Sequence, residues 1–220
     1  MNPFIRLASS TSPYSLSTRL RRSRFRRFSR LLEKRFPGQK LNILDVGGWE
    51  GFWELMNFAD TGHRITLLNI EPQKVSRSNF RAVIGDARDL RQFGNQEFDV
   101  VFSNSVIEHV GSFEDQKKMA VEICRVGRSY FVQTPNFFFP FEPHFLFPMF
   151  HWLPMFARIA LLRRFRLGYY ARASSRSDAL QAINSIRLLR SSEVRSLFPE
   201  ARIARERFLG WTKSLIAVKF

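Results

Sequence analysis

Short apolar runs recur along the middle of the chain, and each has the length and composition typical of a buried strand. Five of them cover residues 41–46, 64–70, 81–84, 98–105 and 128–133. Helical patterns begin after the first run, over residues 52–59, and after the fourth, over residues 113–126. Strands that alternate with helices predict an open, mostly parallel α/β sheet.

The last quarter of the chain carries weaker patterns. Residues 177–180 indicate the start of a helix, and residues 192–197 indicate a second short helix. Residues 202–207 and 214–220 then predict two further strands. The sequence therefore predicts seven strands in all.

Residues 1–36 form a basic extension in front of the first strand. Apolar residues recur there at near-helical spacing among arginines, which predicts an amphipathic basic helix that ends at Pro37 and Gly38. The apolar positions are Leu16, Leu20, Phe25, Phe28, Leu32 and Phe36. We expect a cap that packs on the domain and leaves its arginines in solvent, with a membrane-surface helix as the alternative. Residues 1–18 are Ser-rich and weakly patterned, so we expect them to be mobile.

Length and composition fit one domain, residues 37–220, behind this extension. Cys124 is the single cysteine, so an internal disulfide and a cysteine metal cluster are excluded, and a reducing, cytoplasmic location is expected. The position of Cys124 in a predicted helix favours packing in the core over nucleophilic chemistry. The Arg-rich, acid-poor extension also fits an organelle transit peptide, which stays open as an alternative.

The formal charge of +16 is unevenly distributed. Residues 1–36 carry +9, residues 37–157 carry −3 and residues 158–220 carry +10. The core is thus mildly acidic, and the basic charge lies in the flanks. This pattern favours a peripheral contact with an anionic membrane over a nucleic-acid groove through the core.

A glycine-rich turn follows the first predicted strand at residues 45–51. It contains Asp45, Gly47, Gly48 and Gly51. A strand, glycine turn and helix in succession let backbone N–H groups approach a ligand at the carboxyl end of the strand. An acid at this point suits a cationic ligand. A nicotinamide-binding turn, or a tight turn without a ligand, is the alternative.

This stretch resembles the first motif of class I S-adenosylmethionine (SAM)-dependent methyltransferases, acid-x-Gly-x-Gly-x-Gly. Trp49 occupies the middle glycine position, and Gly48 lies one place early. The resemblance implies SAM as the cofactor. It also implies a Rossmann-like seven-stranded sheet, mostly parallel, with helices on both faces and residues 202–220 as an antiparallel C-terminal hairpin.

Three further motifs follow in the order and spacing of that family. At the end of the second strand, the ribose-binding acid of the family falls at Asn69, with Glu71 two residues on. Asp86 and Ala87 resemble the adenine-side motif, and Asn104 lies in a stretch, 98–109, similar to the family's fourth-strand motif. The resemblance implies that these residues bind the cofactor.

Residues 135–156 form an unusual segment after the fifth strand, with five of the ten prolines and eight of the 24 phenylalanines. It is too interrupted by proline to be a membrane span. The alternatives are a lid over the acceptor pocket, an element in lipid headgroups, or an ordinary hydrophobic insertion. The segment resembles an insertion in bacterial methyltransferases of the type 11/23 group. That resemblance favours a mobile lid, which with the Arg-rich stretch that follows spans residues 135–176.

His109 and His144 are the candidates for a general base, because a histidine can accept a proton at neutral pH. Each also has a structural alternative, as a partner of the backbone or as a solvated loop residue. The predicted function is methyl transfer from SAM to a small-molecule, glycan or lipid-linked acceptor, with no metal assigned. An RNA methyltransferase, or a non-catalytic SAM-binding or membrane-docking module, is the alternative.

Overall fold

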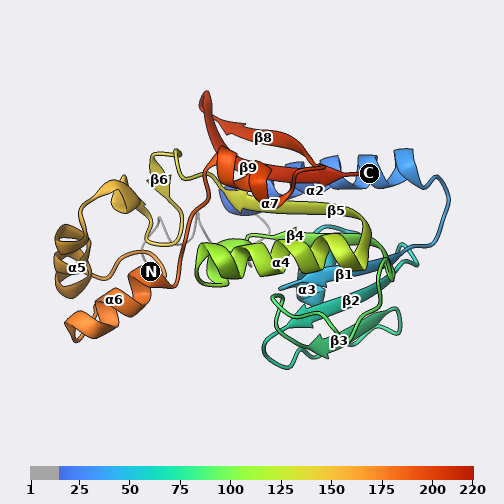
Figure 1. Cartoon of the computed structure of the whole chain (residues 1–220), viewed down its shortest axis with the longest axis horizontal. Coiled ribbons are helices and arrows are strands. Elements are labelled where there is room, and N and C mark those ends of the chain that lie inside the picture. The colour runs from blue at the N-terminus through green and yellow to red at the C-terminus, as the bar shows by residue number, and fades with distance from the viewer. Residues whose placement is uncertain (1–14) are drawn as a thin grey trace.

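One seven-stranded sheet organises the computed structural model, which describes residues 15–220 (Figure 1). The strand order is β3-β2-β1-β4-β5-β9-β8. Most of the stretch predicted to be mobile, residues 1–14, lies outside the described part. The strands are β1 (Asn42–Val46), β2 (Arg64–Asn69), β3 (Phe80–Ile84), β4 (Phe98–Asn104), β5 (Gly127–Pro135), β8 (Arg202–Phe208) and β9 (Trp211–Lys219).

Strands β1 to β5 pair in parallel, and β9 runs antiparallel to both β5 and β8. The predicted mostly parallel sheet with an antiparallel C-terminal hairpin is confirmed. Because parallel strands end at the same edge, the loops after β1, β2, β4 and β5 meet there.

Helices cover both faces of the sheet, as predicted (Figure 1). Helix α4 (Phe113–Val126) and helix α7 (Ser191–Leu197) pack on one face, and α2 (Leu16–Arg35) and α3 (Glu50–Leu55) pack on the other. Helix α4 starts with a capping box in which Ser112 and Asp115 bond each other's backbone N–H groups. Helix α3 is shorter than predicted, because the chain turns at Asn57, which has a left-handed φ of 56°.

Helix α2 is a packed cap, as expected. Phe25, Phe28 and Leu32 are buried in one core with Phe102 and Phe131 of the sheet. The helix therefore shares its core with the domain that was predicted to begin at residue 37. The expectation that its arginines all lie in solvent is wrong for Arg24, which is only 7% exposed.

The insertion after β5 folds around a core of its own (Figure 1). It lies beyond the carboxyl edge of the sheet and contains β6 (Phe141–Glu142), β7 (Phe147–Pro148), η2 (Phe150–Trp152), α5 (Met155–Arg164) and α6 (Arg176–Asn184). Buried members of the insertion core include Phe145, Phe150, Ile159 and Leu162. Within residues 15–220, no helix is long and apolar enough to cross a membrane.

The prediction for Cys124 is wrong, because its side chain is exposed. Helix α4 buries a stripe that includes Met119, Ile123 and Val126. Cys124 follows Ile123 by one position, a rotation of about 100°, which moves it off that stripe.

Candidate functional site

Asp45 lies buried at the end of β1, where the sheet meets the glycine turn. The indole Nε1 of Trp53 in α3 donates to Asp45 Oδ2 at 2.7 Å. Burial raises the pKa of Asp45 to about 7, although this hydrogen bond opposes the shift. A cation brought beside Asp45 would favour its charged form, so the site fits a ligand with positive charge.

The glycines of the turn leave room for neighbouring side chains. A β-carbon at Gly48 would lie 1.8 Å from Asp45 Oδ2, so residue 48 must be glycine for this carboxyl to fit. Gly47 has a left-handed φ of 77°, and a β-carbon there would clash with Val106 after β4. The turn is therefore held tightly between β1 and β4.

Trp49 replaces the glycine that the family motif has at this position, and its ring lies against Gly51. A β-carbon at Gly51 would lie 2.1 Å from the Trp49 ring. The indole remains 42% exposed. Gly51 thus accommodates the bulky residue within the turn, which explains how the motif tolerates the change.

The ends of β2 and β3 are followed or formed by four further residues predicted to bind the cofactor. Asn69 Nδ2 donates to the Gly48 carbonyl at 3.4 Å, so the end of β2 adjoins the turn, and Glu71 is exposed beside it. Asp86 is held by Arg88, whose Nη2 lies 2.5 Å from Asp86 Oδ2, and this hydrogen bond lowers the pKa of Asp86. Ala87 is buried. An adenine amine would have to compete with Arg88 for the Asp86 carboxylate.

Asn104, at the end of β4, accepts a hydrogen bond from the N-terminal helix α2. Arg24 Nη1 of α2 donates to Asn104 Oδ1 at 2.5 Å and to Gln133 Oε1 at 2.6 Å. Its Nη2 contacts Glu206 Oε2 of β8 at 2.6 Å. Arg24 therefore ties α2 to three strands at the carboxyl edge of the sheet.

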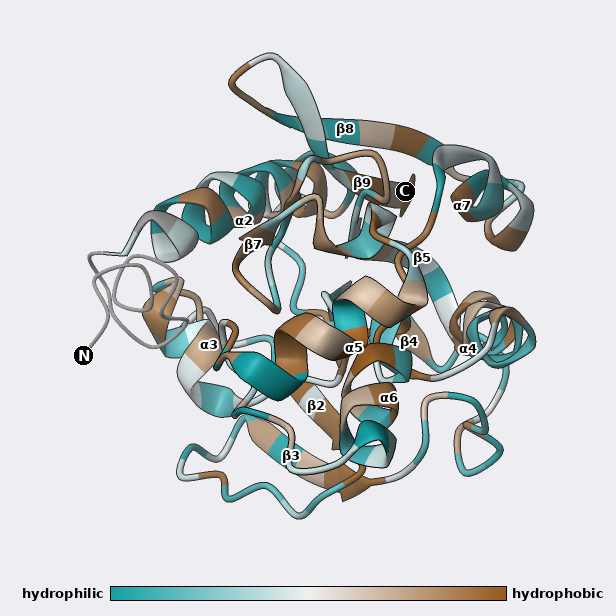
Figure 2. Ribbon diagram, turned by 90° about the vertical axis from the view of Figure 1, so that its left-hand side faces the viewer, coloured by the Kyte–Doolittle hydropathy of each residue, from teal (hydrophilic) through white to brown (hydrophobic). Residues whose placement is uncertain are grey.

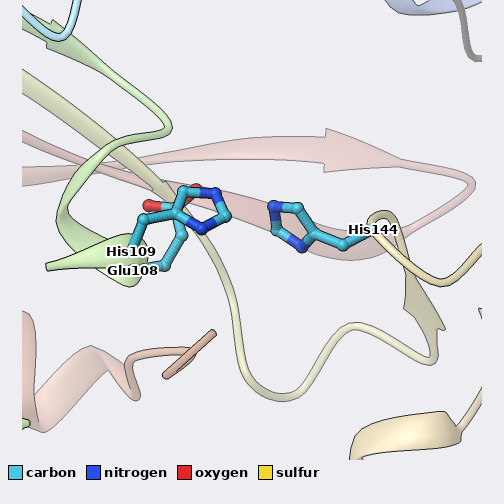
Figure 3. Close-up of side chains that lie close together, drawn as sticks. All are labelled: Glu108, His109 and His144. Atoms are coloured by element: carbon cyan, nitrogen blue, oxygen red, sulfur yellow. The ribbon is translucent and has the colours of Figure 1, made fainter. Parts of the chain in front are cut away.

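The two candidate bases lie together, although 35 residues separate them in the sequence (Figure 3). The rings of His109 and His144 meet edge to face, with centroids 4.8 Å apart. His109 follows β4 in the short helix η1 (Ile107–His109), and His144 comes from the insertion. The carboxylate of Glu108 lies beside the His109 ring (Figure 3).

Glu142 fixes the orientation of His144. Its carboxylate is buried and accepts from the backbone N–H groups of His144 and Phe145 at 2.8 and 2.6 Å. Glu142 Oε1 also lies 2.7 Å from His144 Nδ1. Because a carboxylate only accepts, Nδ1 carries the proton and Nε2 keeps its lone pair.

All three members of this cluster have shifted pKa values, and those of the two histidines shift in opposite directions. Burial lowers the pKa of His144, but the bond and charge of Glu142 outweigh it, so the net shift is upward. Lost hydration and the neighbouring His144 lower the pKa of His109. Burial raises the pKa of Glu108 to about 7, with His144 opposing. Groups whose pKa values are perturbed in this way are typical of sites that move protons.

Glu108 is fully buried and incompletely bonded. Thr134 Oγ1 donates to Glu108 Oε2 at 3.1 Å, while Oε1 has no hydrogen-bond partner among the described residues. The ligand atoms of Glu108, His109 and His144 all lie within 4.8 Å of one another. Such a cluster could also hold a metal ion, which the sequence analysis did not assign.

Sequence reasoning missed Arg24, Glu108 and Glu142 as site residues. A signal existed for Arg24, because it lies four residues from both Leu20 and Phe28 and therefore on the apolar stripe of α2. Glu108 and Glu142 each lie within two residues of a candidate histidine. Acids so close to a possible base are candidates for orienting it.

Comparisons with known proteins agree with this geometry. A model of the methyltransferase domain matches residues 44–130, from β1 into β5. Two uncharacterized proteins of Mycobacterium tuberculosis are 38% identical over 55 residues. That match covers 25% of this chain and 19% of the relatives, so it spans about a fifth of their length.

Solved structures share the fold. Magnesium protoporphyrin IX methyltransferase from Synechocystis, with bound S-adenosylhomocysteine (SAH), is 12% identical with a TM-score of 0.54, over 91% of this chain and 84% of that one. The 1,6-didemethyltoxoflavin-N1-methyltransferase from Burkholderia thailandensis, also with SAH, is 15% identical with a TM-score of 0.50. Its alignment covers 94% of this chain and 88% of the other.

The sheet order and its covering helices define a Rossmann-like α/β protein of the methyltransferase type. The matched methyltransferase domain, together with the acid and glycine turn at the end of β1, supports a class I SAM-dependent methyltransferase. SAM is the cofactor of this family.

Proposed function

We propose that this protein transfers a methyl group from SAM to a hydroxyl of a small-molecule, glycan or lipid-linked acceptor, with His144 as the general base. The observation that carries the proposal is the Glu142–His144 pair. It holds an imidazole with a free Nε2 lone pair beside the loops that follow β4 and β5. The neighbouring Asp45 turn is the predicted cofactor side.

SAM supplies an activated methyl group on a positively charged sulfur. The protein must hold the acceptor oxygen in line with that group and take the hydroxyl proton. His144 Nε2 suits this role, because Nδ1–H is already bonded to Glu142 and the ring cannot rotate freely. After transfer, His144 is positively charged beside the Glu142 and Glu108 carboxyl groups, which stabilise that charge.

The test is transfer of radiolabelled methyl groups from SAM into lipid, glycan, small-molecule and RNA extracts. Label should enter one of the first three extracts, and His144→Gln should reduce it about a hundredfold or more while SAH affinity is kept. Label confined to RNA would favour the RNA methyltransferase. Retained SAH binding with no label in any extract would favour the non-catalytic module.

We also propose that the insertion contacts an anionic membrane. Large apolar side chains gather on its surface, with Phe156 76% exposed and Phe138 53% exposed. The stretch 158–176 adds six arginines and no acid. Figure 2 views the molecule from this side, with α5 in the foreground carrying both apolar and polar residues. Aromatic residues beside basic ones are typical of a surface that lies in lipid headgroups.

Binding to vesicles tests this contact. Vesicles with anionic lipid should bind the protein, and binding should fall steeply with salt, because the arginine contribution is screened. Phe156→Ser should weaken binding. Leu209→Ser, which removes an equally exposed apolar side chain at the tip of the β8–β9 hairpin, should not. Equal binding to neutral and anionic vesicles would refute the proposed electrostatic contribution of the arginines.

A further inference from the structure

A cavity of about 520 Å³ lies within the insertion, next to the segment that leads into α7. This volume is within the range of small-molecule sites. Its lining combines apolar and charged side chains. The lining includes Phe137, Phe145, Phe150, Ile183, His151 and Arg158.

Two of the lining residues each carry a buried atom without a hydrogen-bond partner in the described part of the chain. One is Nδ1 of His151, and the other is Nε of Arg158. A buried polar group without a partner is costly, and native proteins leave few of them. Because both residues line the same cavity, a molecule bound there is a candidate partner for both atoms.

One of the two atoms is a hydrogen-bond acceptor and the other is a hydrogen-bond donor. His151 Nε2 lies 2.8 Å from the carbonyl oxygen of Phe137. Because a carbonyl only accepts, Nε2 carries the proton, and the free Nδ1 is an acceptor. Burial, with a contribution from Arg158, lowers the pKa of His151, so the ring is neutral at neutral pH. Arg158 Nε–H, in contrast, is a donor.

The charge of the wall favours an anion. Arg187 is paired with Glu193, with 2.5 Å between Nη2 and Oε1, and Glu142 is bonded to His144. Arg158 and Arg190 also line the cavity, and neither forms an ion pair with another residue of the described chain, so their charge is available to a ligand. The Arg190 guanidinium lies 4.9 Å from the centre of the Phe137 ring, which adds a flat surface beside the positive charge.

We propose that this cavity binds a small amphipathic hydroxy acid. Its acid oxygen accepts from Arg158 Nε–H, its hydroxyl donates to His151 Nδ1, and its apolar body packs on the phenylalanines. Glu142 lines the cavity and also holds His144, so the bound molecule lies one residue from the proposed base. The inference goes beyond methyl transfer and does not depend on it.

The three hydroxybenzoate isomers are suitable probes, because they vary the spacing between hydroxyl and carboxylate at constant size. Binding is measured on the full chain by ligand-observed NMR and calorimetry, with SAH present and without turnover. At least one isomer should bind, and benzoate and the matching methoxybenzoate, which lack the hydroxyl donor, should bind about tenfold more weakly.

Two variants and one control complete the test. Arg158→Gln and His151→Phe should each weaken the best isomer about tenfold or more. Arg163→Gln removes the same charge from the same helix but outside the cavity and should leave binding unchanged. SAH affinity and the thermal midpoint show whether each variant is folded. No binding by any isomer, equal binding of benzoate, or equal loss in the Arg163 variant would overturn the proposal.

Discussion

Asp45→Asn should stabilise the cofactor-free protein above pH 7 and weaken its binding of SAM. Burial raises the pKa of Asp45 from 3.8 to about 7, against the opposing hydrogen bond from Trp53. One pKa unit corresponds to about 1.4 kcal/mol, so ionising this carboxyl in the folded state costs on the order of 4 kcal/mol at alkaline pH. Asparagine has the same size, keeps a carbonyl acceptor for Trp53 and carries no charge.

The sign follows from the order of the two pKa values. The folded value lies above the unfolded one, so the folded state binds the proton more tightly between about pH 4 and 7. Stability is therefore lost as the pH rises through this window, and the loss persists above it. The Asn variant should not share this loss.

Urea unfolding at about pH 4 and pH 8 measures the effect. The unfolding free energy of Asp45→Asn, relative to that of wild type, should increase by at least about 2 kcal/mol between the two pH values. This is half of the cost of ionising Asp45 given above. Asp60→Asn removes a carboxylate that is 83% exposed and should show no comparable increase in unfolding free energy. An identical pH dependence in wild type and Asp45→Asn would refute the account of a strained buried carboxyl.

Measurements of ligand binding distinguish the role of Asp45 from that of Glu108, whose pKa is also raised to about 7 by burial. Glu108→Gln should show a similar gain in stability, because it removes the other buried carboxyl of this window. In calorimetry, Asp45→Asn should weaken the binding of SAM more than the binding of SAH, since only SAM carries the sulfonium charge. Glu108→Gln should leave both affinities within a few-fold of wild type. Equal weakening of SAM and SAH would mean that Asp45 does not act through charge.

Three further outcomes are expected. Glu142→Gln should lower kcat more than it changes KM and move the pH–rate profile to lower pH, because Glu142 raises the pKa of His144; an unmoved profile would remove Glu142 from the mechanism. Zn²⁺ should inhibit through Glu108, His109 and His144, whose ligand atoms lie within 4.8 Å, and a chelator or His109→Ala should relieve it; activation by Zn²⁺ would instead indicate a metal enzyme. SAM should change the fluorescence of the half-exposed Trp49, and a signal that survives in Trp49→Phe would have to come from another tryptophan.

The parts of the fold that depend on local pattern could be predicted from the sequence. Helix α4 spans the predicted residues 113–126, because its apolar period and its Ser112 cap are both local signals. The strands were predicted to within two residues at each end for the same reason, apart from those of the C-terminal hairpin, where β9 begins three residues earlier than expected. The end of α3 was not predicted, since it depends on the left-handed turn at Asn57.

Contacts between distant segments could not be predicted in this way. The amide oxygen of Asn104, a predicted cofactor residue, accepts from Arg24, 80 residues away. Nothing in the spacing of either residue identifies the other as its partner. The pairing of His109 with His144 had the same difficulty, because it depends on how the insertion folds back over the sheet edge.

This difference explains why the sequence identifies the cofactor and not the acceptor. The predicted cofactor side is centred on one βα turn, Asp45 to Gly51, whose residues fit one another closely: Gly48 makes room for the Asp45 carboxyl, and Gly51 for the Trp49 ring. Such a turn leaves a compact motif in the sequence. The proposed acceptor side joins the loops after β4 and β5 with the insertion, through long-range contacts such as that of His109 with His144. Each of those contacts can change without disturbing the motif, so acceptor specificity must be determined from the structure of that side and from binding to it.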